Sequence, residues 1–122
     1  MNAVTSPIEV EITKHIIYVQ DVNRAVQFYH DVLGFHTGLQ KADWCEMHHG
    51  GSIVGLRGGQ NMISGKTGLA IQVPNIHSAC DHIAASGGRI IEAPKRYNDA
   101  GIHLGIVADT EGNEIMITQI IE

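Results

Sequence analysis

The chain has 122 residues, of which 43% are hydrophobic, and a formal net charge of −5 at pH 7. This composition is typical of one globular domain and excludes a long disordered protein. The eight lysine and arginine residues form no cluster and are outnumbered by thirteen acidic residues, so nucleic acid is not an expected partner.

No segment of the sequence predicts export or insertion into a membrane. The N-terminal stretch lacks both a basic leader and an apolar core, so no signal peptide is expected. No apolar run approaches the ~20 residues that a membrane-spanning helix needs. Cys45 and Cys80 form no CxxC motif and are expected to be reduced and buried. Together these features predict a cytoplasmic protein with no membrane partner.

The first half of the chain is predicted to contain one strand, one helix and three further strands. Residues 11–19 are rich in β-branched and aromatic residues, which is typical of a strand. Asp21 caps a helix whose apolar residues recur at helical spacing until Gly34 ends it. Short strands are then expected at residues 35–40, 44–48 and 52–57, with Gly50 and Gly51 in the last turn.

The second half follows the same plan after a glycine-rich linker at residues 58–66. A strand is expected at residues 67–73 and a helix at residues 75–86, which ends at Gly87 and Gly88. Further strands are expected at residues 89–92, 102–108 and 114–120. The last two are joined by the turn Asp109-Thr110-Glu111-Gly112-Asn113.

The two halves share one sequence pattern at an offset of 54 residues. The positions in register are Ile17/Ile71, Val19/Val73, Asp21/Asn75, Val22/Ile76, Ala25/Ala79 and Gly34/Gly88. The repeat predicts an α+β fold in a single domain (residues 1–122), made of βαβββ module 1 (about residues 11–57), the linker and βαβββ module 2 (about residues 67–120). The groove between two such halves is a natural ligand site.

Several motifs make the chain resemble the vicinal oxygen chelate superfamily, which includes glyoxalase I, bleomycin-resistance proteins and extradiol dioxygenases. The motifs are Tyr18-Val19-Gln20-Asp21-Val22, Ala25-Val26-Gln27-Phe28-Tyr29, Val32-Leu33-Gly34-Phe35, Gly87-Gly88, Pro94 and the turn from Asp109 to Asn113 with Glu114-Ile115. The resemblance spans about residues 12–119 and implies a fold with a cup-shaped cavity. It also implies a homodimer. It does not imply one activity, because this fold supports several chemistries.

The resemblance also implies four metal-ligand positions, and in this sequence they are occupied by Lys14, Gly55, Gly68 and Met116. These residues are unsuited to a hard divalent cation, which prefers imidazole and carboxylate ligands. No cofactor or metal is therefore predicted. One alternative stays open, since a one-residue bulge would bring His15 into the cup, so a divalent metal is possible only at a non-standard site.

Strand alternation predicts which side chains line the cup. The expected ligand-binding residues are Lys14, Tyr18, Trp44, Arg57, Gln72 and Met116. Trp44 and Tyr18 would stack on a planar ligand, and Arg57 or Lys14 would pair with an anionic group. Gly55 and Gly68 are expected to leave room where a metal centre would otherwise be. The alternative for Trp44 is that it fills the space between the sheets.

Three residues are candidates for catalysis. Glu46 and His48 lie two residues apart on one strand face, where they would form a general acid–base pair or, alternatively, a solvated surface pair. His103 lies in the middle of a strand of the second half, on a face that the sequence does not determine. Its alternative role is that of a hydrogen-bonded structural histidine.

The leading hypothesis is a glyoxalase/bleomycin-resistance-like protein that binds a small organic ligand in the cup without the metal centre of the superfamily. One alternative is a metal-dependent glyoxalase-type lyase or isomerase, or a dioxygenase-like enzyme, with a non-standard metal site. A third hypothesis is a structural or regulatory subunit without a ligand, in which the two halves serve only dimerisation. The sequence leaves open whether the protein is an enzyme.

Overall fold

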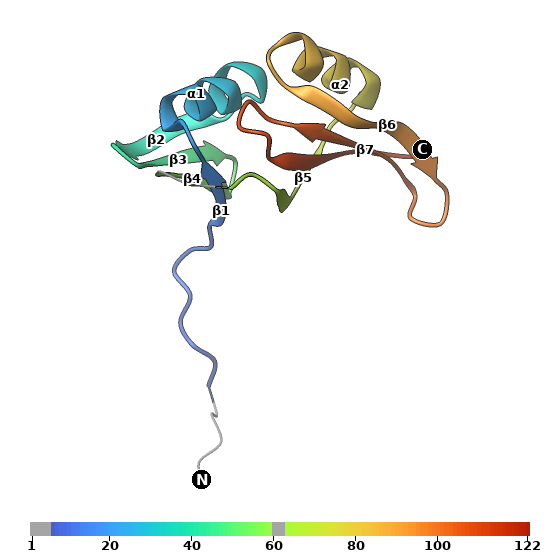
Figure 1. Cartoon of the computed structure of the whole chain (residues 1–122). Coiled ribbons are helices and arrows are strands. Elements are labelled where there is room, and N and C mark those ends of the chain that lie inside the picture. Colours follow the sequence, from blue (N-terminus) through green and yellow to red (C-terminus); the bar gives the residue numbers. More distant parts are fainter. Residues whose placement is uncertain (1–5, 60–62) are drawn as a thin grey trace.

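Two four-stranded sheets, each covered on one side by a helix, make up the fold (Figure 1). A computed structural model describes residues 6–59 and 63–122 of the chain. The strand orders are β1-β4-β3-β2 in sheet 1 and β5-β8-β7-β6 in sheet 2. The two sheets therefore have the same topology, and the α+β fold of two βαβββ modules is confirmed.

The elements alternate as the repeat predicts. Module 1 contains β1 (His15–Val19), α1 (Val22–Gln27), η1 (Phe28–Val32), β2 (His36–Lys41), β3 (Trp44–His49) and β4 (Ser52–Gly58). Module 2 contains β5 (Lys66–Gln72), α2 (Ile76–Ala85), β6 (Arg89–Tyr97), β7 (Ile102–Ala108) and β8 (Glu114–Ile120). The helix of module 1 continues from α1 into η1, a final π-helical turn.

Both helices begin with the same capping interaction. The side chain of Asp21 accepts a hydrogen bond from the backbone N–H of Arg24 at 3.0 Å, and the side chain of Asn75 accepts one from Ser78 N–H at 3.1 Å. Each bond satisfies an N–H group that the helix itself leaves unpaired. The two capping residues occupy equivalent positions of the sequence repeat, so the repeat extends to the hydrogen bonds.

The first strand is shorter than the sequence analysis predicts. It begins at His15 instead of Glu11, although residues 11–14 alternate as a strand does. His15 pairs with Val54 in parallel, and β4 itself begins only at Ser52. The residues before Thr13 therefore have no neighbouring strand to bond, and β propensity alone does not make a strand.

Strand β6, at the outer edge of sheet 2, is longer than expected, whereas β7 and β8 have the expected bounds. Strand β6 continues to Tyr97, past the expected end at Glu92, and its pairing with β7 shifts register twice. The strand contains Pro94, which lacks an N–H group. An edge strand tolerates a proline because one side of its backbone has no partner.

Side-chain alternation divides each sheet into two faces. On sheet 1 the helix-covered face carries buried residues, namely Ile17, Val19, Cys45, Met47, Val54 and Leu56. On sheet 2 the covered face carries Val107, Ile115 and Ile117, which pack with Ile76, Cys80 and Ile83 of α2. The opposite faces have no helix over them, and we call them the open faces.

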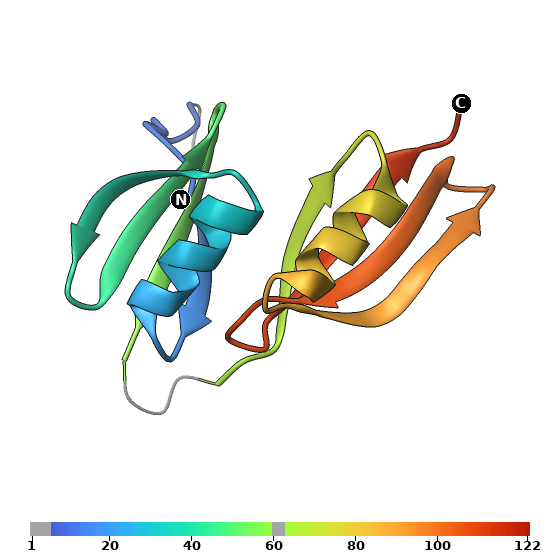
Figure 2. The same ribbon diagram turned by 90° about the horizontal axis from the view of Figure 1, so that it is seen from above.

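The turn between β7 and β8 joins the two modules. Asn113 donates from Nδ2 to the carbonyl oxygen of Tyr18 at 2.7 Å, and Tyr29 donates its hydroxyl to Asp109 Oδ2 at 2.8 Å. Glu111 accepts hydrogen bonds from Arg24 and from the backbone at the start of α1. Figure 2 shows this red turn reaching from sheet 2 towards module 1. The expected turn at residues 109–113 is therefore also the main polar contact between the modules.

The arrangement of the helices determines where the open faces lie. Both helices lie on the same side of the two sheets, so the open faces lie side by side on the other side (Figures 1 and 2). None of the helices described has the length and apolar character needed to cross a membrane.

Candidate functional site

Six predicted site residues lie together on the open face of sheet 1. They are Lys14, Tyr18, Trp44, Glu46, His48 and Arg57. The register brings them into rows. Tyr18 on β1 and Trp44 on β3 both pair with Arg57 on β4, between them. Directly opposite residues on neighbouring strands have side chains in contact range, so the row forms one surface.

The indole ring of Trp44 lies across Gly55. A Cβ atom placed on Gly55 would collide with the six-membered part of this ring, so position 55 requires a residue without a side chain. Trp44 is half-buried. The expectation that Gly55 leaves empty room is wrong, because the Trp44 ring occupies the space.

Lys14 and Glu46 form an ion pair across the same face. The distance from Lys14 Nζ to Glu46 Oε2 is 2.7 Å, although Lys14 directly precedes β1 and Glu46 lies on β3, and β4 separates these two strands. Gly55, the β4 partner of Glu46, carries no side chain between them. The hydrogen bond from Lys14 lowers the pKa of Glu46, despite an opposing desolvation effect. Lys14 Nζ also lies 5.9 Å from the centre of the Trp44 ring, within cation–π range.

His48 lies near Glu46 but does not form a close pair with it. The distance from His48 Nε2 to Glu46 Oε1 is 3.8 Å, which is too long for a hydrogen bond. The lowered pKa of Glu46 makes its carboxylate a weak base while Lys14 remains bound to it. The two residues thus share a face, as predicted, and the ion pair with Lys14 competes with an acid–base role.

Arg57 and Tyr18 give this face an exposed cation beside an exposed ring. The side chain of Tyr18 is 51% exposed, and Arg57 is also exposed. Within the described chain the side chain of Arg57 has no ion-pair or hydrogen-bond partner. An unpaired guanidinium next to two aromatic rings is suited to a planar anion, because it offers a bidentate donor at the edge of a stacking surface.

Gln72 and Met116, the other two expected ligand-binding residues, lie on sheet 2 and are not brought together with these six. Met116 pairs with Ala70 and Ile106 in the middle of the open face of sheet 2. Gln72 lies at the end of β5. Gly68 has a φ of 75° at a register shift in β5, so its backbone conformation explains why glycine occurs there.

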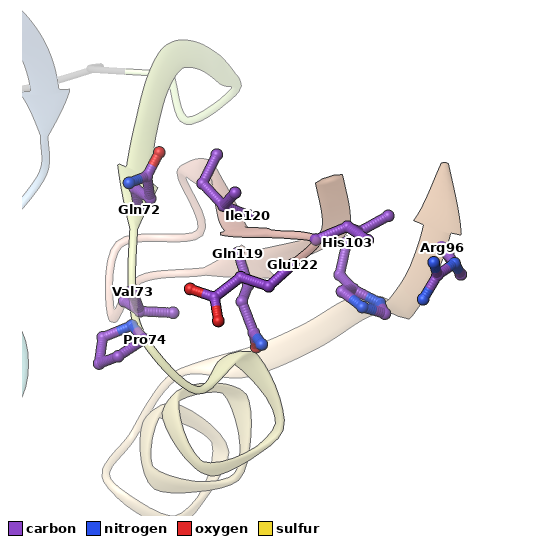
Figure 3. Close-up of a pocket in the computed structure, with 9 residues that line it drawn as sticks. Gln72, Val73, Pro74, Arg96, His103, Gln119, Ile120 and Glu122 are labelled. Carbon is purple, nitrogen blue, oxygen red and sulfur yellow. The ribbon is translucent and has the colours of Figure 1, made fainter. Parts of the chain in front are cut away.

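His103 lies on the other side of sheet 2, facing the helix layer. It pairs with Arg96 on β6 and with Gln119 on β8. These residues line a cavity of about 700 Å³ at the end of β5 and the start of α2, together with Gln72, Val73, Pro74, Ile120, Ile121 and Glu122. Figure 3 shows His103, Gln119 and Arg96 on one side of the sheet. His103 is therefore separated from Glu46 and His48, and the three candidates do not form one catalytic group.

His15 makes a contact between the modules. Its Nε2 lies 2.7 Å from the carbonyl oxygen of Thr67 at the start of β5. The residue pairs with Val54 in regular register, without the bulge that would turn it towards the open face.

Comparison with known proteins decides the family. The profile of the Glyoxalase/Bleomycin resistance protein/Dioxygenase superfamily matches residues 11–117, which is most of the chain. The protein belongs to this superfamily.

Individual similar proteins show how far the similarity extends. The chain is 26% identical over 120 residues to a protein named "Probable lactoylglutathione lyase" from Synechocystis sp., and the match covers 85% of this chain and 91% of the relative. A superfamily enzyme from Burkholderia phytofirmans PsJN has a TM-score of 0.77 at 17% identity, covering 92% of this chain and 100% of that one.

TnmS3, an antibiotic binding protein from Streptomyces sp. CB03234, has a TM-score of 0.75 at 17% identity, with 94% of this chain and 99% of that chain covered. At these identities the structural matches establish the shared fold. Proteins with this fold thus include both ones named as enzymes and ones named for binding.

The metal centre that the superfamily implies does not fit the residues at the four expected positions. Lys14 is bound to Glu46, the Trp44 ring covers Gly55, and Gly68 and Met116 offer no hard ligand. In the described part of the chain, no three histidine, cysteine, aspartate or glutamate residues are grouped so that they would hold a metal ion.

Several features of the site have no signal within a single stretch of sequence. The ion pair between Lys14 and Glu46 joins residues 32 positions apart. Opposite charges at predicted face positions on either side of a glycine would have indicated it. The role of Glu111, which accepts hydrogen bonds from residues about 90 positions away, has no such local signal.

Proposed function

We propose that this protein binds a small, planar, anionic organic molecule on the open face of sheet 1, without the metal centre of its superfamily. The row formed by Tyr18, Arg57 and Trp44 is the observation that carries the proposal. A ring of the ligand would stack on Trp44 or Tyr18, and its acidic group would bind the unpaired guanidinium of Arg57.

The polar residues around this row support binding more strongly than catalysis. Glu46 is held by Lys14 at 2.7 Å, and its lowered pKa keeps it ionised at neutral pH, so it does not serve as a general acid there. An ion pair on the floor of a ligand site orients a ligand through directional contacts. Lys14 retains donor capacity, because an ammonium group has three N–H donors and Glu46 uses one.

The names of related proteins favour two classes of function. TnmS3 is named as an antibiotic binding protein, which agrees with a ligand-binding role for the common fold. The Synechocystis relative is named as a probable lactoylglutathione lyase, and this observation favours a second candidate function, a glyoxalase-type lyase or isomerase. The second function would need a metal at a non-standard site, because the residues at the four positions implied by the superfamily are not suitable metal ligands.

Trp44 is the single tryptophan of the chain, so its fluorescence reports on the proposed site directly. The test is a titration with 4-nitrobenzoate, a planar aromatic acid that quenches indole fluorescence. We expect saturable quenching, and weaker quenching by the uncharged 4-nitrobenzamide. The substitution Arg57→Gln should lower the affinity for 4-nitrobenzoate at least about tenfold, the usual scale for one charge-assisted contact.

A matched control variant is Arg89→Gln, which removes an exposed arginine from β6 of the other sheet. It should leave the titration unchanged. Failure of 4-nitrobenzoate and of related planar aromatic acids to give saturable quenching would contradict the proposal.

Elemental analysis of untagged protein tests the second candidate function, the glyoxalase-type lyase or isomerase. Close to one zinc, nickel, iron or manganese per chain, together with lyase activity on the hemithioacetal of methylglyoxal and glutathione, would establish the lyase in place of the binder.

A further inference from the structure

Lys41 is an exposed cation on the open face of sheet 1, beside the proposed ligand site. It is the last residue of β2 and pairs directly with Trp44 on β3. Directly opposite residues of antiparallel strands project from the same face, so Lys41 shares the open face with Trp44. The preceding residue supports this placement. The side chain of Gln40 donates a hydrogen bond to Asn23 of α1 at 3.3 Å, so it points to the helix-covered side, and its neighbour Lys41 points to the other.

The register places Lys41 at one end of a row of side chains that crosses all four strands of sheet 1. The order along the row is Lys41 on β2, Trp44 on β3, Arg57 on β4 and Tyr18 on β1. Cations and aromatic rings therefore alternate across the face. Neighbouring strands are about 4.8 Å apart, so the backbones of Lys41 and Arg57 are about 10 Å apart, with Trp44 between them.

No side chain of the described chain neutralises either Lys41 or Arg57. Within residues 6–59 and 63–122, neither side chain makes an ion pair or a hydrogen bond. Asp43, in the turn that precedes Trp44, forms no ion pair with Lys41. The third cation of this face, Lys14, is already bound to a carboxylate, that of Glu46, at 2.7 Å. The two cations that remain available to a ligand are therefore the ones on either side of Trp44.

The charge of this face is opposite to the charge of the whole chain. The described strands leave two positive charges unneutralised on the open face of sheet 1, whereas the formal net charge of the chain is −5. A local excess of positive charge attracts anions to one face of a protein that repels them elsewhere. The net charge repels a dianion more strongly than a monoanion, so a preference for the dianion requires two cations at the site itself.

We propose that Lys41 determines the charge of the ligand, and that the site selects planar organic dianions over monoanions. One acidic group of the ligand binds Arg57, the other binds Lys41, and the ring between them stacks on Trp44. This inference rests on the proposed function, because it assigns a ligand class to the same site. The guanidinium group offers a bidentate contact to the first acidic group, and the flexible ammonium group of Lys41 meets the second as a point charge.

The test compares two ligands that differ by one charge. 5-Nitroisophthalate carries two carboxylates on one planar ring, and its monomethyl ester keeps the ring, the nitro group and one carboxylate. Nitro-substituted rings quench indole fluorescence, and Trp44 is the single tryptophan of the chain. At low ionic strength, where screening is weak, the wild type should bind the dianion at least about threefold more tightly than the monoester, the usual scale of one exposed charge pair.

The variant Lys41→Gln should lose this preference and bind the two ligands with dissociation constants that agree within about 1.5-fold, because only Arg57 is left to bind an acidic group. Its fold should be intact by circular dichroism, since Lys41 is exposed and unpaired. Arg57→Gln should weaken the binding of both ligands. Lys95→Gln is the matched control, because it removes an exposed lysine from β6 of the other sheet, and it should keep the wild-type preference.

The outcomes separate this inference from the proposed function. If the wild type binds both ligands saturably and with equal affinity, the inference is overturned and the proposed function stands. A preference for the dianion that persists in Lys41→Gln also overturns the inference, because another cation must then bind the second acidic group. Absence of saturable quenching by either ligand contradicts the proposed function, and the inference with it.

Discussion

Arg24 in the first module binds Glu111 in the second through two hydrogen bonds, 2.6 Å from Nε to Oε2 and 3.0 Å from Nη2 to Oε1. The carboxylate of Glu111 is fully buried, while the arginine side chain is 51% exposed. Oε1 also accepts the backbone N–H of Asp21 at 2.9 Å. One buried carboxylate therefore holds both the start of α1 and an arginine on its first turn, which positions module 1 against module 2.

The substitution Glu111→Gln should destabilise the protein by about 1–3 kcal/mol, measured by urea unfolding at pH 7. An amide keeps the shape of the carboxylate but loses the charge-assisted bonds, and the half-exposed arginine limits the loss because water can solvate it. Glu92→Gln, on the exposed edge strand β6, is the control and should change stability by less than about 0.5 kcal/mol. Equal stability of Glu111→Gln and wild type would show that the contact contributes nothing.

The stability advantage of the wild type over Glu111→Gln should shrink on acidification. Burial opposes ionisation of Glu111, but the hydrogen bonds from Arg24 and Asp21 outweigh it and hold its pKa below the usual value. A carboxyl with a lowered folded-state pKa contributes stability above its unfolded pKa of about 4.3, and loses it as the pH falls through the folded pKa. Unfolding curves between pH 7 and pH 3 test this. An advantage that grows on acidification would contradict the assignment.

Asp109 acts in the opposite sense, since burial raises its pKa. The contribution of Asp109 to the free energy of unfolding is therefore lost as the pH rises. Both proteins in the comparison retain Asp109, so this effect largely cancels in the difference between them.

Tyr29→Phe should cost about 1–2 kcal/mol of unfolding free energy, because Asp109 Oδ2 loses a buried donor at 2.8 Å. The other oxygen of Asp109 keeps the backbone N–H groups of Glu111 and Asn113. Burial raises the pKa of Tyr29 well above its ordinary value, so the phenol is a donor throughout the neutral range. The exposed Tyr18→Phe is the control for loss of a hydroxyl, and both are measured by chemical unfolding. A Tyr29→Phe protein as stable as this control would refute the prediction.

Gly55→Ala should push the Trp44 ring off the sheet, because the new methyl group would occupy the position of the indole. We expect a red shift of the fluorescence emission maximum as the ring enters water, together with weaker binding of 4-nitrobenzoate. Gly51→Ala is the matched control, since nothing lies within 4 Å of a Cβ atom at that position. The same spectrum for both variants would mean that the ring does not rest on Gly55.

Glu46→Gln should strengthen the binding of 4-nitrobenzoate several-fold, because it releases the ammonium group of Lys14 for the ligand. The titration at low ionic strength is the sensitive measurement, as screening by salt weakens charge–charge contacts at an exposed site. Glu92→Gln removes the same charge at a distance and should have little effect. Weaker binding by Glu46→Gln would indicate that the carboxylate itself contacts the ligand.

The periodicity of the sequence was sufficient to predict the order of the elements. The alternation in β3 and β4 and the helical spacing after Asp21 and Asn75 are local properties, and local geometry follows from them. The prediction of a strand from Glu11 is wrong for Glu11 and Ile12, because a strand also needs a neighbour and β4 begins too late to provide one.

The same reasoning explains what was predicted about the site. Alternation alone places Trp44, Glu46 and His48 on one face of one strand. The position of the Trp44 ring over Gly55 depends on a neighbouring strand, and the bond between Lys14 and Glu46 depends on two. Such contacts follow from the register between strands, which a single sequence does not contain. The ligand-binding role of these residues stays a prediction.

The turn that joins the modules occurs in only one of them. Its counterpart in module 1, between β3 and β4, consists of Gly50 and Gly51 and carries no side chain that would bind across. The two halves therefore keep a common backbone plan, but module 1 depends on the carboxylates of module 2, whereas module 2 has no such need of module 1. A separately produced module 1 would leave Arg24 and Tyr29 without their carboxylates, whereas module 2 would only expose charged groups to water. An exchange of the two halves along the chain would preserve every strand and helix, yet it would succeed only if Glu111 still reached Arg24.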